Sequence, residues 1–131
     1  MLKLEIVTPE RRVLDTEVEA VTVPTASGEA GILSNHSPLV SELKPGVLSY
    51  TVRGSVDKLA IAGGFVEVSG NKVSVLTDFA ETAAEVNFEA ARADREAAER
   101  ELAAASSNTV EANQPLTERL ELAKARLALR P

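Results

Sequence analysis

The stretch Phe65-Val-Glu-Val-Ser-Gly-Asn-Lys-Val-Ser-Val-Leu-Thr77 decides the class of the first part of the chain. Its valines alternate with polar residues on both sides of a central Gly-Asn pair, and this period of two is typical of half-buried strands. Glycine and asparagine adopt positive φ in tight turns more readily than other residues. Residues 69–72 therefore predict a hairpin turn between two antiparallel strands.

Short runs of the same kind fill the sequence on the N-terminal side of this hairpin. They are rich in β-branched residues and are separated by Gly, Pro, Ser or Asn, at residues 2–6, 17–23, 48–53 and 58–62. The seven glycines all lie at or before Gly70, and Gly63-Gly64 predicts a bulge or a bend at which the chain changes sheet. Helical stretches do not alternate with these strands, so the pattern favours an antiparallel β-sandwich and excludes Rossmann and TIM-barrel folds.

The last part of the chain is predicted to be helical. Residues 88–105 consist almost entirely of alanine and charged residues, which are strong helix formers, and Asn87 is a suitable N-cap. Ser106-Ser-Asn-Thr109 interrupts this pattern, and a second helix is expected from near Pro115 to about Leu129. The fold class is therefore α+β: an N-terminal antiparallel β-sandwich over residues 1–85, then a C-terminal two-helix antiparallel hairpin over residues 86–131.

Alanines line most of the seam expected between the two helices. Burying an alanine methyl contributes about 0.8 kcal/mol, whereas a buried leucine contributes about 1.5–3 kcal/mol. Such a hairpin is held by weak contacts and suits an element that moves, although a helical tail packed permanently on the sandwich fits the same pattern. The residues expected in the seam are Ala91, Ala98, Leu102 and Ala105 of the first helix and Leu116, Leu120, Ala123 and Leu127 of the second.

Composition excludes several classes of function. The chain has no cysteine and a single histidine, His36, so thiolate metal sites, cysteine nucleophiles and paired-histidine metal sites are excluded. A net charge of −6 argues against nucleic-acid binding. The longest apolar run, residues 59–66, is too short to cross a bilayer. We therefore expect no catalytic residue, no cofactor, no metal and no direct membrane insertion.

The second predicted helix carries an excess of basic residues in an acidic protein. From Leu116 onward the sequence has two acidic residues and four basic ones, Arg119, Lys124, Arg126 and Arg130. Basic residues near a helix C-terminus complement its dipole, which accounts for part of this pattern. The functional interpretation is a basic arm that binds an acidic protein surface.

The densest local motif is Gly28-Glu-Ala-Gly-Ile-Leu-Ser-Asn-His-Ser-Pro-Leu39. Its glycines predict a tight turn before a short strand, and Asn35-His-Ser-Pro38 predicts a second turn. The motif lacks the Lys-Ser/Thr pair of a phosphate-binding loop. His36, although flanked by serines, fits a turn residue bonded to backbone better than a catalyst, because no acid can be assigned to orient it.

Three motifs, in order and ahead of an alanine-rich helical pair, resemble the epsilon subunit of the F-type ATP synthase along essentially the whole chain. They are the glycine motif above, Leu43-Lys-Pro-Gly-Val-Leu48, and Ile61-Ala-Gly-Gly-Phe-Val-Glu-Val68 leading to Val73-Ser-Val-Leu-Thr-Asp78. The resemblance implies a non-catalytic subunit of the central stalk, bound to the gamma subunit and resting on the c-ring. There it would couple ion flow to ATP synthesis and restrain ATP hydrolysis.

The resemblance also implies roles for individual residues. The loop containing His36 would bind gamma, and the turn at Glu29 would face the c-ring. Arg119, Lys124 and Arg126 would meet an acidic surface of a beta subunit in the alpha/beta catalytic head when the hairpin extends. The expected location is peripheral, on the cytoplasmic face of a bacterial plasma membrane or the stromal or cytosolic side of a thylakoid membrane.

One family feature is altered in this sequence. Some bacterial relatives bind ATP through an Ile-Asp-x-x-Arg-Ala segment, whose counterpart here is Val86-Asn-Phe-Glu-Ala-Ala-Arg-Ala93. Asn87 replaces the aspartate, and Arg92 arrives two residues late, which rotates it by roughly 200° around a helix. We therefore predict that ATP is not bound at physiological strength.

Two other functions stay compatible with the residues alone. One is a free-standing β-sandwich that binds a small ligand or a glycan, with the helices as a dimerisation tail, although the scarcity of aromatic residues argues against glycan stacking. The other is a hydrolase built on His36 and its neighbouring serines.

Overall fold

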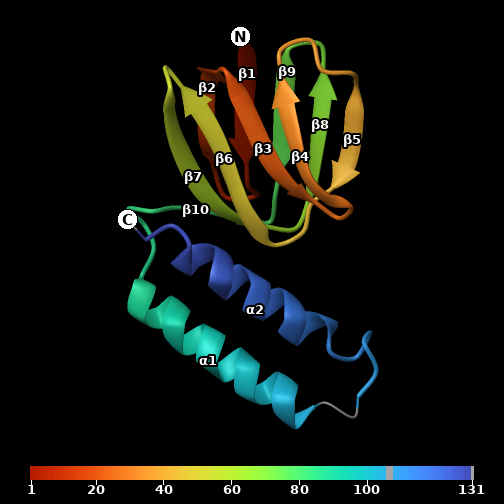
Figure 1. Ribbon diagram of the computed structural model, residues 1–131, viewed down its shortest axis with the longest axis vertical. Coiled ribbons are helices and arrows are strands. Elements are labelled where there is room, and N and C mark those ends of the chain that lie inside the picture. The colour runs from red at the N-terminus through yellow and green to blue at the C-terminus, as the bar shows by residue number, and fades with distance from the viewer. Residues whose placement is uncertain (106–107, 131) are drawn as a thin grey trace.

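The computed structural model describes residues 1–105 and 108–130 and contains two five-stranded sheets followed by two helices (Figure 1). The predicted α+β class, a β-sandwich followed by a helical hairpin, is confirmed. The strands are β1 (Leu2–Val7), β2 (Arg12–Val18), β3 (Ala20–Thr25), β4 (Gly28–Leu33), β5 (Leu39–Glu42), β6 (Gly46–Val52), β7 (Ser55–Ala62), β8 (Phe65–Ser69), β9 (Lys72–Leu76) and β10 (Phe79–Thr82). The helices are α1 (Phe88–Ala104) and α2 (Gln114–Leu127).

We call the sheet with strand order β2-β1-β9-β8-β5 sheet A and the sheet with order β10-β7-β6-β3-β4 sheet B. Every pair of neighbouring strands is antiparallel except β1 and β9, which run parallel. The predicted hairpin is β8–β9, with Val66 opposite Val75 and all its inward valines buried. Gly70 has the expected positive φ of 58° in its turn.

The run at residues 17–23 is not one strand as the alternation predicted. β2 ends at Val18 in sheet A, and β3 begins at Ala20 in sheet B, so the bend at Glu19 carries the chain between the sheets. Val18, Val21 and Val23 are all buried in the core between the sheets. The buried residues change from an even position, Val18, to odd positions, Val21 and Val23, and this change marks the bend.

The Gly63-Gly64 pair is another point at which the chain changes sheet, as predicted. It joins β7 of sheet B to β8 of sheet A, with φ values of 72° and 90°. A Cβ on Gly64 would overlap the carbonyl oxygen of Leu76 and lie 2.7 Å from the Cα of Thr77. The buried Thr77 hydroxyl lies 2.8 Å from the Gly63 carbonyl oxygen, which it can donate to, and so fixes the crossing.

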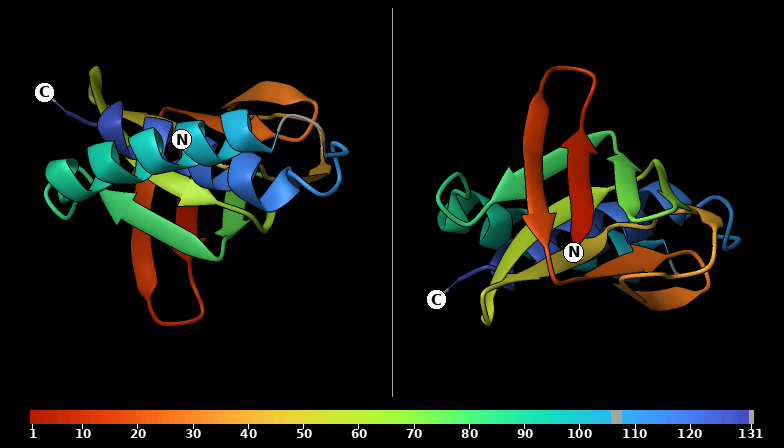
Figure 2. Two further views of the ribbon diagram at one scale, coloured as in Figure 1. Left: turned by 90° about the horizontal axis from the view of Figure 1, so that it is seen from below. Right: turned by 90° about the horizontal axis from the view of Figure 1, so that it is seen from above.

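The two helices stack on one side of the sandwich, with α2 between α1 and sheet B (Figures 1 and 2). Asn87 caps α1 as expected, because its side-chain oxygen accepts a hydrogen bond from the Ala90 N–H at 3.0 Å. One face of α2 packs against α1, and the opposite face places Ala125 and the following Leu129 against Ala60 of β7. The sequence predicted the first of these faces but not the second.

Candidate functional site

Glu29 lies near the start of β4, and His36 lies beyond its end. Glu29 is exposed beside the β3–β4 turn, where it pairs with Pro24 of β3. His36 follows the other end of the strand, in the loop that leads to β5 at the far end of the sandwich (Figure 1). The structure therefore separates the two predicted interface residues, and each would serve a different contact.

The loop that contains His36 is held by backbone contacts and by a neighbouring turn. The His36 N–H donates to the Leu33 carbonyl at 3.2 Å, and the His36 Nδ1 lies 2.6 Å from the Ser37 carbonyl oxygen. The Asn35 N–H donates at 2.8 Å to the side-chain oxygen of Asn71, in the β8–β9 turn. This half-buried histidine is thus a turn residue, and Asn71, which sequence reasoning did not single out for this role, positions its loop.

The outer face of sheet A carries an apolar row formed by Val7, Leu76 and Phe65. The register places Leu76 beside both Val7 and Phe65, and Phe65 and Leu76 are each 57% exposed. The row borders a depression of about 460 Å³. A second depression, of about 310 Å³, lies nearer the His36 loop, beside the 70% exposed Val40.

Sequence reasoning treated Phe65 and Leu76 only as strand residues. In β8 and β9 the buried positions are the valines, so these two large apolar residues fall on the positions that face solvent. Phe65 and Leu76 alternate with the buried valines, so the sequence already indicated that large apolar residues lie on the solvent-facing side of these strands.

The basic residues of α2 have separate environments. Arg126 is mostly buried: its side chain is 15% exposed, and its Nε lies 2.8 Å from Oε1 of Glu81 on β10. Arg119 pairs with Glu101 of α1 at 3.0 Å. Lys124 is exposed, and no ion pair involves it among the described residues. In this pose the three residues therefore do not form one continuous basic arm.

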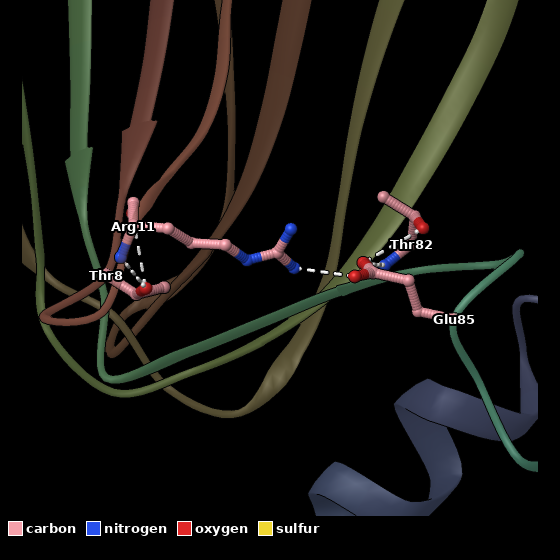
Figure 3. A network of polar contacts seen from close by, with 4 residues as sticks. All are labelled: Thr8, Arg11, Thr82 and Glu85. Carbon is pink, nitrogen blue, oxygen red and sulfur yellow. Dashed lines mark hydrogen bonds and ion pairs between the residues drawn. The ribbon is translucent and has the colours of Figure 1, made fainter.

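The linker between the sandwich and α1 is fixed by Glu85 (Figure 3). Its Oε2 lies 2.7 Å from Nη2 of Arg11 in the β1–β2 turn. Its Oε1 accepts hydrogen bonds from the N–H and the hydroxyl of Thr82, each at 3.0 Å. The hydrogen bond from the Thr82 backbone is the main reason that the pKa of Glu85 is lowered, and Arg11 lowers it further.

The segment aligned with the family's nucleotide motif is used structurally. Asn87 caps α1, and Arg92 pairs with Glu89 within the first turns of the same helix at 2.6 Å. Within residues 1–105 and 108–130, no group of three or more His, Cys, Asp or Glu side chains could hold a metal ion. Neither α1 nor α2 has the length and apolar character needed to span a membrane.

Comparisons with known proteins agree with this architecture. Residues 1–83 match the family model described as the beta-sandwich domain of the ATP synthase Delta/Epsilon chain. The ATP synthase epsilon chain of Desulfitobacterium hafniense (strain Y51) is 50% identical over 99 residues, which are 76% of this chain and 75% of that one. The epsilon chain of Syntrophobacter fumaroxidans is 41% identical over 98% of this chain and 87% of its own length.

A solved structure extends the likeness to the helices. A chain in the Euglena gracilis mitochondrial ATP synthase, from a structure of its OSCP/F1/c-ring part, is 28% identical and superposes with a TM-score of 0.79. The match covers 97% of this chain and 79% of that one. On the match to the sandwich domain and the relatives aligned over nearly all residues, this chain belongs to the epsilon chains of ATP synthase.

Proposed function

We propose that this epsilon chain is a non-catalytic subunit of the central stalk. It couples ion flow through the c-ring to ATP synthesis at the catalytic head, and its helical hairpin restrains ATP hydrolysis. The observation that carries this proposal is the placement of two exposed loops, around Glu29 and His36, at opposite ends of one closely packed sandwich. A stiff body with a contact at each end can transmit torque between two partners.

The gamma subunit binds the outer face of sheet A, from the His36 loop to the apolar row. Exposed apolar side chains that gather on one face of a small protein mark interaction surfaces. The helices leave this face open because they pack against sheet B. The Glu29 turn contacts the c-ring, and it is stiffened by the Thr25 hydroxyl, which donates to the Gly28 carbonyl at 2.5 Å.

The hairpin acts as the brake. In the compact pose of this structure α2 lies on β6 and β7. In an extended pose Arg119, Lys124 and Arg126 would contact an acidic surface of a beta subunit. Attraction between exposed charges is screened beyond roughly 8 Å at physiological salt, so the brake requires direct contact.

The gamma surface is tested by Phe65→Ser and Leu76→Ser, with Val56→Ser as the matched control. Val56 is also 57% exposed but lies on β7 of sheet B. Because a buried leucine or phenylalanine contributes about 1.5–3 kcal/mol, each row variant should weaken binding to an epsilon-free alpha/beta/gamma complex roughly tenfold or more. Equal affinities for the row variants and the control would refute this surface.

The brake is tested by truncation after Glu85 and by measurement of ATP hydrolysis in the reconstituted catalytic head. Hydrolysis should rise relative to the head carrying the full chain. Unchanged hydrolysis would remove the inhibitory role and leave the coupling role standing. Membership in the epsilon chains favours this function over a free-standing ligand-binding module and over a hydrolase.

We also propose the location that goes with this function. The subunit associates peripherally with the membrane-bound complex, on the cytoplasmic face of a bacterial plasma membrane or the equivalent side of a thylakoid membrane.

A further inference from the structure

We call Arg126, Glu81 and Asp94 the Arg126 cluster. Arg126 lies where β10, α1 and α2 meet. Its Nε pairs with Glu81 of β10 at 2.8 Å, and its Nη1 lies 3.7 Å from Oδ2 of Asp94 on α1. One guanidinium on α2 is therefore joined both to the sandwich and to the other helix. Arg119 adds a second link between the helices through Asp94 at 3.4 Å.

Burial distinguishes the Arg126–Glu81 pair of this cluster from the other ion pairs of the described residues, whereas Asp94 is 47% exposed. The side chains of Arg126 and Glu81 are 15% and 16% exposed, whereas both partners in the Arg11–Glu85 and Arg119–Glu101 pairs are at least 39% exposed. Exposed pairs contribute little, but separating a largely desolvated pair without new partners is costly. The remaining contacts of the helical region with sheet B are modest. Among the described residues, this region contributes Ala125 and Leu129 as buried side chains, with Phe88 and Leu122 partly buried beside them.

We propose that Glu81 and Asp94 act as an internal acidic surface that competes for Arg126 with an external acidic partner. The inference rests on the proposed function, because it concerns the regulation of the same basic residues. Arg126 cannot pair with Glu81 and with a distant carboxylate surface at once, so the cluster sets the balance between compact and extended poses. Lys124 is exposed already in the compact pose and is free to make the first contact with an acidic partner.

The competing partner must offer the same chemistry as the site that α2 leaves. That site combines a carboxylate, Glu81, with small apolar side chains, Ala60 and the partly buried Val47. When α2 leaves, its Ala125 and the following Leu129 also become exposed. We therefore expect the surface that captures α2 to place carboxylates beside an apolar strip, not to be acidic alone.

Opening of the compact pose can be measured with a single buried thiol, because the natural chain has no cysteine. Ala125→Cys places the thiol on the face of α2 that packs on sheet B, at a position that is 5% exposed. Its rate of reaction with a thiol reagent then follows the population of open molecules. Val66→Cys, in the sandwich core, reports unfolding of the whole sandwich instead.

The perturbations are Glu81→Gln alone and together with Asp94→Asn, each in the Ala125→Cys background. Glu96→Gln is the matched control, since it removes the same charge from an exposed α1 residue outside the cluster. A hydrogen bond between charged groups stabilises the compact pose more than a neutral one does, so Glu81→Gln should increase the population of open molecules. Labelling should therefore become roughly tenfold faster in Glu81→Gln, and faster still in the double variant. Labelling in the control, and labelling of Val66→Cys, should not change.

Unchanged labelling of Ala125→Cys in both cluster variants would overturn the proposal, and so would equal acceleration by Glu96→Gln. A second measurement separates this outcome from failure of the proposed function. The cluster variants without added cysteine should inhibit ATP hydrolysis by the reconstituted head more strongly than the natural chain. Faster labelling without stronger inhibition would support the cluster and refute the inhibitory role of the hairpin.

Discussion

Replacement of Gly64 by alanine should disrupt the crossing between the two sheets far more than the same change in a hairpin turn. Gly64 has a φ of 90°, and an added Cβ would overlap the Leu76 carbonyl oxygen and approach the Thr77 Cα to 2.7 Å. These atoms are backbone atoms and cannot rotate away. Gly70, with a φ of 58°, has nothing within 4 Å of an added Cβ, so Gly70→Ala isolates the cost of positive φ.

The two costs can be estimated separately. Alanine at positive φ costs about 1–2 kcal/mol, which is all that Gly70→Ala should lose. Forcing an extra methyl against a closely packed neighbour costs a further 1–3 kcal/mol, so Gly64→Ala should lose about 2–5 kcal/mol. That is a large part of the roughly 5–15 kcal/mol that stabilises a typical domain.

Urea unfolding of the two variants beside the natural chain measures this difference directly. Gly64→Ala should show a clearly lower midpoint, and a Tm lower by roughly 10–20 °C. Gly70→Ala should lower the midpoint and the Tm clearly less than Gly64→Ala does. If Gly64→Ala is no less stable than Gly70→Ala, the close approach of Gly64 to the β9–β10 connection is wrong.

Three further predictions follow from other parts of the chain. Because the pKa of Glu85 is lowered in the folded state, its stabilising effect is complete above its ordinary value of 4.5 and is lost as pH falls through the folded pKa. The free energy of unfolding, measured at pH 7 and from pH 5 to 3, should be lower for Glu85→Gln than for the natural chain at pH 7, and the two should converge in acid. A difference that stays constant with pH would contradict this, and Glu10→Gln is the exposed control. Ala98→Leu, at a fully buried position of the α1–α2 seam, should increase proteolysis within α1 without lowering the stability of the sandwich, whereas Ala93→Leu on the exposed face should not. Calorimetric titration with ATP should detect no sub-millimolar binding, and such binding would refute the inference drawn from the altered nucleotide motif.

Local patterns predicted the local structure. The Phe65–Thr77 stretch forms the β8–β9 hairpin, Gly63-Gly64 changes sheet, and Asn87 caps α1. These features depend on residues close together in the chain, where alternation, positive φ and capping act directly. The same patterns missed β2, β5 and β10. Two of these are four-residue strands, too short to show a period.

The features that require distant residues could not be predicted in this way. Alternation at residues 17–23 does not reveal that the chain leaves one sheet and enters the other at Glu19. The sequence shows that Arg126 is positively charged but does not reveal its partner, because Glu81 lies 45 residues away in the sequence. The apolar row depends on the pairing of Leu76 with both Val7 and Phe65, which only the sheet order determines.

The parallel pairing of β1 with β9 affects how the chain folds during its synthesis on the ribosome. Leu4 lies beside Val73, so β1, which is synthesised well before β9, has no permanent neighbour on that side until β9 has emerged. Contacts so remote along the chain slow folding. Until then β2 is the hydrogen-bonded neighbour of β1 in sheet A, and the sheet is completed shortly before the helices that lie on the sandwich are translated.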